Sequence, residues 1–149
     1  MRPTSLDLLG LHATLAQAVE RFAARYHFGV QVSSEGDARR VPPPVAMHVY
    51  RIVQEALTNV ARHAQASRMT LTLTESDDAF TLTLADDGRG IDAVPGRPGS
   101  IGLFSMAERA REIGAYLRVQ QAPGGGTELQ LTLPLPVPFA LLAPQEGAS

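Results

Sequence analysis

Two eight-residue stretches of the chain alternate between apolar and polar side chains, and this pattern restricts the possible folds most. The stretches RMTLTLTE (68–75) and AFTLTLAD (79–86) are joined by the three residues SDD. Successive side chains of a strand point to opposite faces, so the leucines of both stretches and Phe80 would lie on one face. The pattern therefore predicts a β-hairpin with one buried face.

Three further segments place apolar side chains at the spacing of one helix face. The first runs from Leu11 to about Tyr26, and the second is VYRIVQEALTNVARHA (49–64), which ends near AQAS. The third is IGLFSMAERAREIGA (101–115), with Gly114 as a C-terminal stop.

Shorter alternating stretches complete the pattern. VQVS (30–33) predicts a strand, and YLRVQQ and TELQLTL flank the turn APGGG, which predicts a second hairpin. The glycine- and proline-rich residues 86–100 predict a loop. The expected order is helix, strand, helix, hairpin, loop, helix, hairpin. Such elements pack as two layers, a mostly antiparallel sheet with helices on one face, so we expect an α+β fold.

Composition excludes several classes of function. A length of 149 residues fits one domain, and the absence of cysteine excludes disulfides and thiolate metal sites. The net charge of -2 and the lack of any basic run longer than Arg39-Arg40 argue against direct nucleic-acid binding. No apolar run approaches the ~20 residues that span a bilayer. We expect a cytoplasmic segment without direct membrane contact, although the full-length protein could carry a membrane anchor.

A polar stripe on the second predicted helix is the first candidate site. Arg51, Glu55, Asn59 and His63 recur every four residues, with Arg62 beside the last. Arg51 and Glu55 could form an ordinary i, i+4 ion pair, and His63 with Arg62 a solvated helix end. Asn59 fits that explanation poorly, because Asn is a mediocre helix former whose side-chain oxygen is a hard ligand suited to Mg²⁺.

Two glycine-rich segments are further candidates. In ADDGRGID, Asp86 ends a predicted strand, and the following glycines permit positive φ or close approach of a ligand. A turn in which an aspartate caps the backbone is an equally good reading of DDG. In GRPGSIGL, Gly99 and Gly102 precede a helix, whose N-terminus favours phosphate, although a flexible loop would have the same composition. The chain contains no P-loop GxxxxGK[ST].

Four motifs in register resemble a known family. QEALTNVARHA, DDGRGID, SIGLFSMAERA and GGGTELQLTLP are similar to the N, G1, G2 and terminal Gly-Thr boxes of the ATP-binding catalytic domain of sensor histidine kinases. The similarity covers about residues 6–134. It is greatest to the subfamily that pairs with response regulators carrying a helix-turn-helix output domain.

This resemblance implies a Bergerat-type α/β sandwich, shared with gyrase-like and chaperone ATPases, that binds Mg·ATP between the long helix and a mobile lid. By position, Asn59 matches the Mg²⁺ ligand, and Glu55 matches the acid that helps to polarise the nucleophile. Asp86 matches the residue that accepts a hydrogen bond from the adenine amino group, and Thr127 supports it.

Further ATP-binding positions follow from the same motifs: Arg62, His63, Gly88, Gly90, Ile91, Gly102 and Leu103. Two departures accompany them. Ser100 stands where the first G2 glycine is expected, with Gly99 displaced by one. The histidines at 12, 27, 48 and 63 are followed by Ala, Phe, Val and Ala, so none is the family's phosphoacceptor, which an acidic residue follows.

We therefore expect three regions: residues 1–10 as the connection from a missing dimerisation region, 11–134 as the catalytic domain, and 135–149 as a proline-rich tail. The expected function is donation of the ATP γ-phosphate to a histidine on that dimerisation domain, which in turn serves a cognate response regulator. The alternative is an anti-sigma-factor-like serine kinase or an ATP-regulated switch on the same fold. A binding module without nucleotide would require all four motifs to be coincidental.

Residues 92–100 are predicted to act as the lid.

Overall fold

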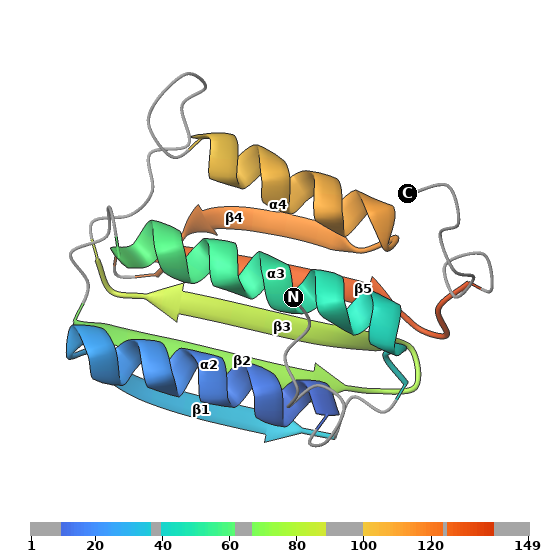
Figure 1. The fold of residues 1–149 in the computed structure, drawn as a ribbon, viewed down its shortest axis with the longest axis horizontal. Helices are drawn as coiled ribbons and strands as arrows, with labels where there is room; N and C mark the ends of the chain where they lie inside the picture. Colours follow the sequence, from blue (N-terminus) through green and yellow to red (C-terminus); the bar gives the residue numbers. More distant parts are fainter. Residues whose placement is uncertain (1–9, 37–39, 62–66, 89–99, 124, 139–149) are drawn as a thin grey trace.

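The computed structural model describes residues 10–36, 40–61, 67–88, 100–123 and 125–138 (Figure 1). Along the chain the elements are α2 (Gly10–Tyr26), β1 (Gly29–Glu35), α3 (Pro43–Asn59), β2 (Arg68–Glu75), β3 (Ala79–Asp86), α4 (Ser100–Glu112), β4 (Tyr116–Gln121) and β5 (Thr127–Pro134). Both predicted hairpins, the single strand and the three helices are present in the predicted order.

The strands form one sheet in the order β1-β2-β3-β5-β4. β1 pairs with β2 in parallel, while β2–β3, β3–β5 and β4–β5 are antiparallel. All three helices cover the same face of this sheet (Figure 1). The α+β, two-layer architecture with a mixed, mostly antiparallel sheet is therefore confirmed.

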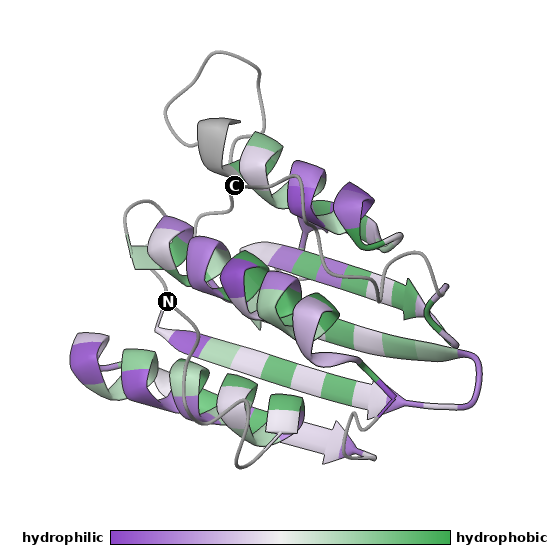
Figure 2. Ribbon diagram, turned by 45° about the vertical axis from the view of Figure 1, so that its right-hand side comes forward, coloured by the Kyte–Doolittle hydropathy of each residue, from purple (hydrophilic) through white to green (hydrophobic). Residues whose placement is uncertain are grey.

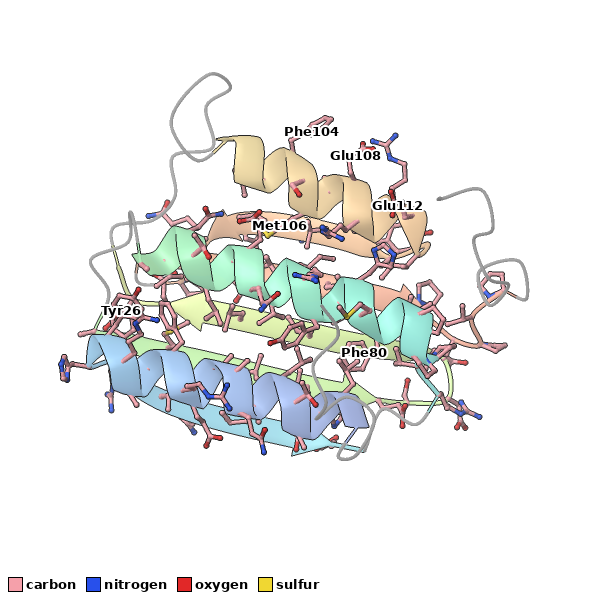
Figure 3. The ribbon with its side chains drawn as sticks, in the orientation of Figure 1. Tyr26, Phe80, Phe104, Met106, Glu108 and Glu112 are labelled. Carbon is pink, nitrogen blue, oxygen red and sulfur yellow. The ribbon has the colours of Figure 1, made fainter. Side chains whose placement is uncertain are left out.

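The core lies between the helices and the covered face of the sheet. Residues alternate between hydrophobic and hydrophilic along β2, β3 and β5 (Figure 2), and the large hydrophobic ones are buried. Phe80 of β3 is fully buried, whereas Phe104 of α4 is 67% exposed and points away from the sheet (Figure 3). The buried strand residues are Met69, Leu71, Leu73, Phe80, Leu82, Leu84, Leu129, Leu131 and Leu133.

The helix ends follow local sequence signals. α3 begins at Pro43, because prolines fit the first helical turn, where an N–H has no intrahelical partner. α4 ends at Glu112, and Gly114, the predicted stop residue, follows with a φ of 73°. The N–H of Ala115 donates to the Ala110 carbonyl at 2.9 Å, the bond that closes a Schellman motif. Within the described ranges, no helix has both the length and the apolarity needed to cross a membrane.

The domain extends past its predicted C-terminal boundary. Leu135 and Val137 are each only 8% exposed and belong to the core, and the Leu135 N–H donates to the Asp78 carbonyl at 2.8 Å. The alternation of buried and exposed residues along β5 continues past the end of the strand at Pro134. The predicted tail is therefore wrong for residues 135–138, while residues 1–9 and 139–149 lie outside the described part.

Candidate functional site

Three polar side chains meet in one buried cavity. They come from the end of α3, the end of β3 and the start of β5, which lie on the left in Figure 1. Asn59 is the last residue of α3, Asp86 the last of β3 and Thr127 the first of β5, and they are 4%, 7% and 6% exposed. The antiparallel pairing of β3 with β5 places Asp86 beside Thr127. Three predicted site residues from separate segments thus share one cavity.

The cavity itself is small and mainly apolar. Its volume is about 20 Å³, which is room for a single water molecule, so a larger ligand requires its walls to open. Met106 of α4 forms part of these walls, and methionine side chains adapt readily to a changed cavity. The remaining apolar wall residues are Ala56, Val60, Leu84, Val119 and Leu129.

Asp86 is held in an orientation set by the backbone around it. Its Oδ1 accepts a hydrogen bond from the Gly88 N–H at 2.8 Å, and the Thr127 N–H also donates to its carboxylate. Burial raises the pKa of Asp86 above its ordinary value, and these two hydrogen bonds oppose that shift only in part. A carboxylate in this position can serve as a hydrogen-bond acceptor for a ligand.

Asn59 has an unused hydrogen-bond donor. Its Nδ2 is buried and has no hydrogen-bond partner among the residues that the structure describes. Buried polar groups are nearly always paired, so this amide is a donor that a bound ligand or water can use. The same amide carries an oxygen, so the group offers both a donor and a hard ligand.

The sequence predicted that the polar stripe of α3 faces a single site, but its residues line two different places. Asn59 points into the cavity, whereas Arg51 and Glu55 are half-buried and line a surface trough of about 170 Å³ with Arg109 of α4. A helix has 3.6 residues per turn, so residues spaced by four drift by about 40° at each step. The stripe therefore winds from the trough toward the cavity.

Gly126 is a site residue that the sequence reasoning missed. Its φ is 84°, and a Cβ placed on it would lie 2.0 Å from the Asp86 carbonyl oxygen. Only glycine allows this approach between the start of β5 and the end of β3. The run of three glycines before Thr127 was the available signal: it predicts a turn and belongs to the Gly-Thr box, but neither assigns a separate role to Gly126.

Asp87, the next residue of the turn, does not line the cavity. Its Oδ1 accepts hydrogen bonds from the N–H groups of Ser67 and Arg68, and its Oδ2 accepts one from the Ser67 hydroxyl, each at 2.8 Å. The backbone bond to Arg68, followed by those to Ser67, lowers the pKa of Asp87. The alternative reading of DDG, a turn capped by an aspartate, thus holds for Asp87, while Asp86 lines the cavity.

The remaining predicted site residues divide into two groups. Gly102 and Leu103 lie in the first turn of α4, and Leu103 packs against the core. Arg62, His63, Gly90 and Ile91 lie outside the described residues, as does nearly all of the predicted lid. No group of three His, Asp or Glu side chains within the described ranges could hold a metal ion unaided.

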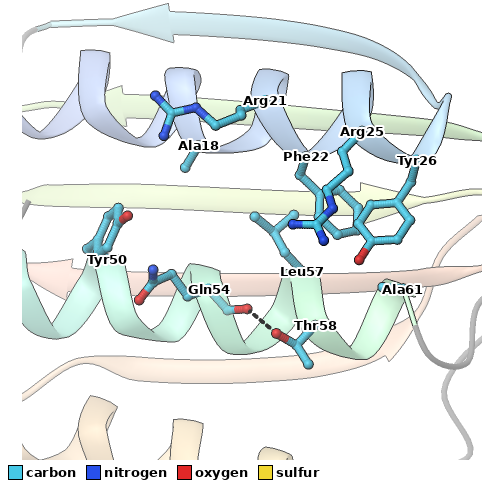
Figure 4. A pocket seen from close by; sticks show the side chains of 10 residues that line it. All are labelled: Ala18, Arg21, Phe22, Arg25, Tyr26, Tyr50, Gln54, Leu57, Thr58 and Ala61. Atoms are coloured by element: carbon cyan, nitrogen blue, oxygen red, sulfur yellow. Dashed lines mark hydrogen bonds between the residues drawn. The ribbon is translucent and has the colours of Figure 1, made fainter.

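A larger hollow lies elsewhere, in a groove of about 510 Å³ between α2 and α3 (Figure 4). Phe22, Tyr50 and Leu57 line it, and the Arg25 guanidinium lies 5.6 Å from the centroid of the Tyr26 ring at its rim. It is open to solvent and contains none of the predicted site residues. The small cavity, with its three buried polar groups, is therefore the better candidate.

Comparison with known proteins agrees with this geometry. Residues 45–137 match the histidine kinase-, DNA gyrase B-, and HSP90-like ATPase family. The chain belongs to this family. The matched region includes α3 from Val45 onward, the cavity and the whole of β5, and it ends at Val137, which the structure also places in the core. The resemblance drawn from the four motifs is thereby confirmed.

Among similar members of this ATPase family are two sensor kinases. The chain is 33% identical, over 91% of its length, to the signal transduction histidine-protein kinase/phosphatase DegS of Brevibacillus brevis and to the sensor histidine kinase LiaS of Bacillus subtilis (strain 168). It spans 35% and 37% of these proteins, about a third of their length.

A similar solved structure is the histidine kinase domain of the blue-light activated histidine kinase of Erythrobacter litoralis EL346. The TM-score is 0.67 at 28% identity, and the match covers 89% of this chain and 69% of that one.

Proposed function

We propose that this chain is the ATP-binding kinase domain of a two-component sensor. It binds ATP with Mg²⁺ in the cytoplasm and donates the γ-phosphate to a histidine on a separate dimerisation domain, which then serves a cognate response regulator. The observation that carries this proposal is the meeting of Asn59, Asp86 and Thr127 in one cavity of a histidine-kinase-like ATPase fold. The names of the similar proteins favour a sensor kinase over a serine kinase.

Asp86 reads the base in this proposal. As a buried carboxylate it accepts a hydrogen bond from the exocyclic amino group of adenine. Thr127 supports it from the adjacent strand. Guanine has a carbonyl oxygen at that position, so two acceptors would face each other. ATP is therefore preferred over GTP, because a buried charged group left without its donor costs roughly 1–3 kcal/mol or more.

Asn59 fits the role of a magnesium ligand. Mg²⁺ in nucleotide sites is usually held by one or two protein oxygens together with the phosphates, so a single amide oxygen at the cavity is sufficient. Its Nδ2, which has no partner among the described residues, can donate to a phosphate oxygen or a bound water. When bound, the ion neutralises charge on the phosphoryl group.

Glu55 acts at the face where the acceptor arrives. It is half-buried in the open trough beside α4, one helical turn before Asn59, so a histidine from another domain can approach it. There Glu55 accepts a hydrogen bond from the acceptor imidazole and helps to polarise it, a positioning and charge-stabilising role typical of phosphoryl transfer. Arg62, His63, Gly90 and Ile91 complete the proposed ATP site together with Gly88, Gly102 and Leu103.

Phosphotransfer to a dimerisation domain supplied in trans tests this proposal. The chain should bind ATP more tightly with Mg²⁺, should not phosphorylate itself, and should label the acceptor histidine of the added domain. Glu55→Gln should retain ATP binding and lose most of the transfer, whereas Gln54→Ala, a neighbour in the same trough, should retain both. Acid-labile phosphohistidine on this chain alone, or absence of ATP binding, would refute the proposal.

A further inference from the structure

The geometry points to Asp87 as a positioning residue for base recognition: its clamp on Ser67 and Arg68 fixes the turn that aims the Asp86 carboxylate. This inference rests on the proposed function, because it concerns the selectivity of the same site for ATP. Asp87 does not contact the base in this account. It acts through the neighbouring residue.

The clamp uses both carboxylate oxygens of Asp87. Oδ1 accepts hydrogen bonds from the two consecutive backbone N–H groups of Ser67 and Arg68. Oδ2 accepts a hydrogen bond from the Ser67 hydroxyl, and all three bonds are 2.8 Å long. The Asp87 N–H returns a bond to the Arg68 carbonyl at 3.2 Å. Hydrogen bonds to an ionised acceptor are shorter and stronger than neutral ones. The turn after β3 is thus fastened at four points to the start of β2.

The start of β2 is itself anchored. The Ser67 carbonyl accepts a hydrogen bond from the Gly29 N–H at 2.8 Å, so Ser67 is also bound to the first residue of β1. Asp87 therefore joins its turn to a segment that two strands hold in place. As long as the clamp is intact, the turn can shift only together with this anchored segment.

Asp86 depends on the path of this turn. Its Oδ1 bonds to the N–H of Gly88, so residues 86–88 form a short loop with Asp87 at its centre. On the other side, Gly126 lies so close that a Cβ would be 3.0 Å from the Asp87 Cα. The clamp and Gly126 hold the turn from two sides. If the clamp is lost, the Gly88 N–H moves and the Asp86 carboxylate loses its orientation.

A purely stabilising role for Asp87 makes a different prediction. An anchor that only stabilises the β2–β3 pair would lower the stability of the protein and leave the folded site unchanged. The ratio of ATP to GTP affinity separates the two roles, because both affinities are measured on the same folded molecules. Stability alone does not separate them.

The experiment measures ATP and GTP affinities, with Mg²⁺, for the parent chain and four variants. Asp87→Ala removes the clamp. Asp87→Asn keeps an oxygen for both N–H groups and an amide that can donate to the Ser67 hydroxyl, so it should rescue the site. Asp86→Ala gives the ratio of ATP to GTP affinity for a site without base recognition. Asp78→Ala removes a carboxylate at the opposite end of the same hairpin and serves as the matched control.

We expect Asp87→Ala to reduce the ATP preference by about tenfold, toward the value of Asp86→Ala. Asp87→Asn and Asp78→Ala should remain within about twofold of the parent, a difference well under 1 kcal/mol. Should the alanine variant not fold, Asp87→Ser takes its place with the same expectation, because the shorter side chain cannot span both N–H groups.

An Asp87 variant that is less stable but keeps the parental ATP-to-GTP ratio would overturn the inference. So would an asparagine variant that loses selectivity as fully as the alanine variant, because the charge rather than the clamp would then be responsible. Failure of the proposed function looks different: the parent itself would not bind ATP or would not prefer it over GTP.

Discussion

Burial of the Asp86 side chain imposes a cost that should appear as a pH dependence of stability. Its pKa in the folded protein is raised, chiefly by desolvation, from an ordinary value of 3.8. A raised pKa means that its contribution to stability is fully present below the unfolded value and is lost as the pH rises through the folded value. The free energy of unfolding of the parent minus that of Asp86→Asn should therefore decrease from about pH 4 upward.

Urea unfolding of both proteins at several pH values would measure this difference without nucleotide. A difference that stays constant, or one that grows with pH, would contradict the assignment of a raised pKa to Asp86.

Asn59 permits a second prediction about a single residue. Asn59→Ala removes a buried amide whose Nδ2 has no partner in the described residues, so the fold should tolerate the change. The affinity gained on adding Mg²⁺ should fall by about tenfold, equivalent to ~1.4 kcal/mol. Thr58→Ala is the matched control, because Thr58 is adjacent but bonds back to the Gln54 carbonyl. Calorimetry with and without Mg²⁺ measures this gain in affinity. An equal gain for Asn59→Ala and the parent would show that Asn59 is not a ligand of the metal.

Among the elements, the turn between β4 and β5 controls the approach of β5 to the site. Gly125 and Gly126 both have positive φ, so alanine at either position carries the strain of a left-handed residue, about 1–2 kcal/mol. Only Gly126 also faces a backbone contact, 2.0 Å from its added Cβ to the Asp86 carbonyl oxygen, whereas Gly125 has open space. Gly126→Ala should therefore cost more stability than Gly125→Ala and should also weaken ATP binding. Urea unfolding and ATP titration of the two variants test this, and equal effects would show that the close contact is unimportant.

The elements were predictable from the sequence because their signals are local. The alternation of β2, β3 and β5 and the glycine at the end of α4 determine each element within a few residues. The neighbour relation of β3 and β5 has no such local signal, yet it brings Asp86 to Thr127. Without the family resemblance, these two residues would not have been joined in one site. The clamp of Asp87 on Ser67 was missed for the same reason, since it depends on the pairing of β2 with β3.

At the scale of the whole molecule, the domain boundary lies beyond residue 134. A chain that ends at Pro134 lacks Leu135 and Val137, two buried side chains, and the hydrogen bond from Leu135 to Asp78. Each lost side chain should cost about 1.5–3 kcal/mol of hydrophobic stabilisation. A chain that ends at Pro138 should keep both. Thermal unfolding of the two truncated chains measures the difference, and equal midpoints would place the boundary at residue 134 after all.

The central claim is that this fold holds ATP through its adenine at Asp86, and competition binding with ATP and GTP tests it most directly. The parent should bind ATP at least about tenfold more tightly than GTP, since each tenfold step corresponds to ~1.4 kcal/mol and the unpaired carboxylate costs at least that. Asp86→Ala should bind ATP more weakly and lose most of this preference. Unchanged selectivity in Asp86→Ala would contradict the account, because the base would then be read by another residue.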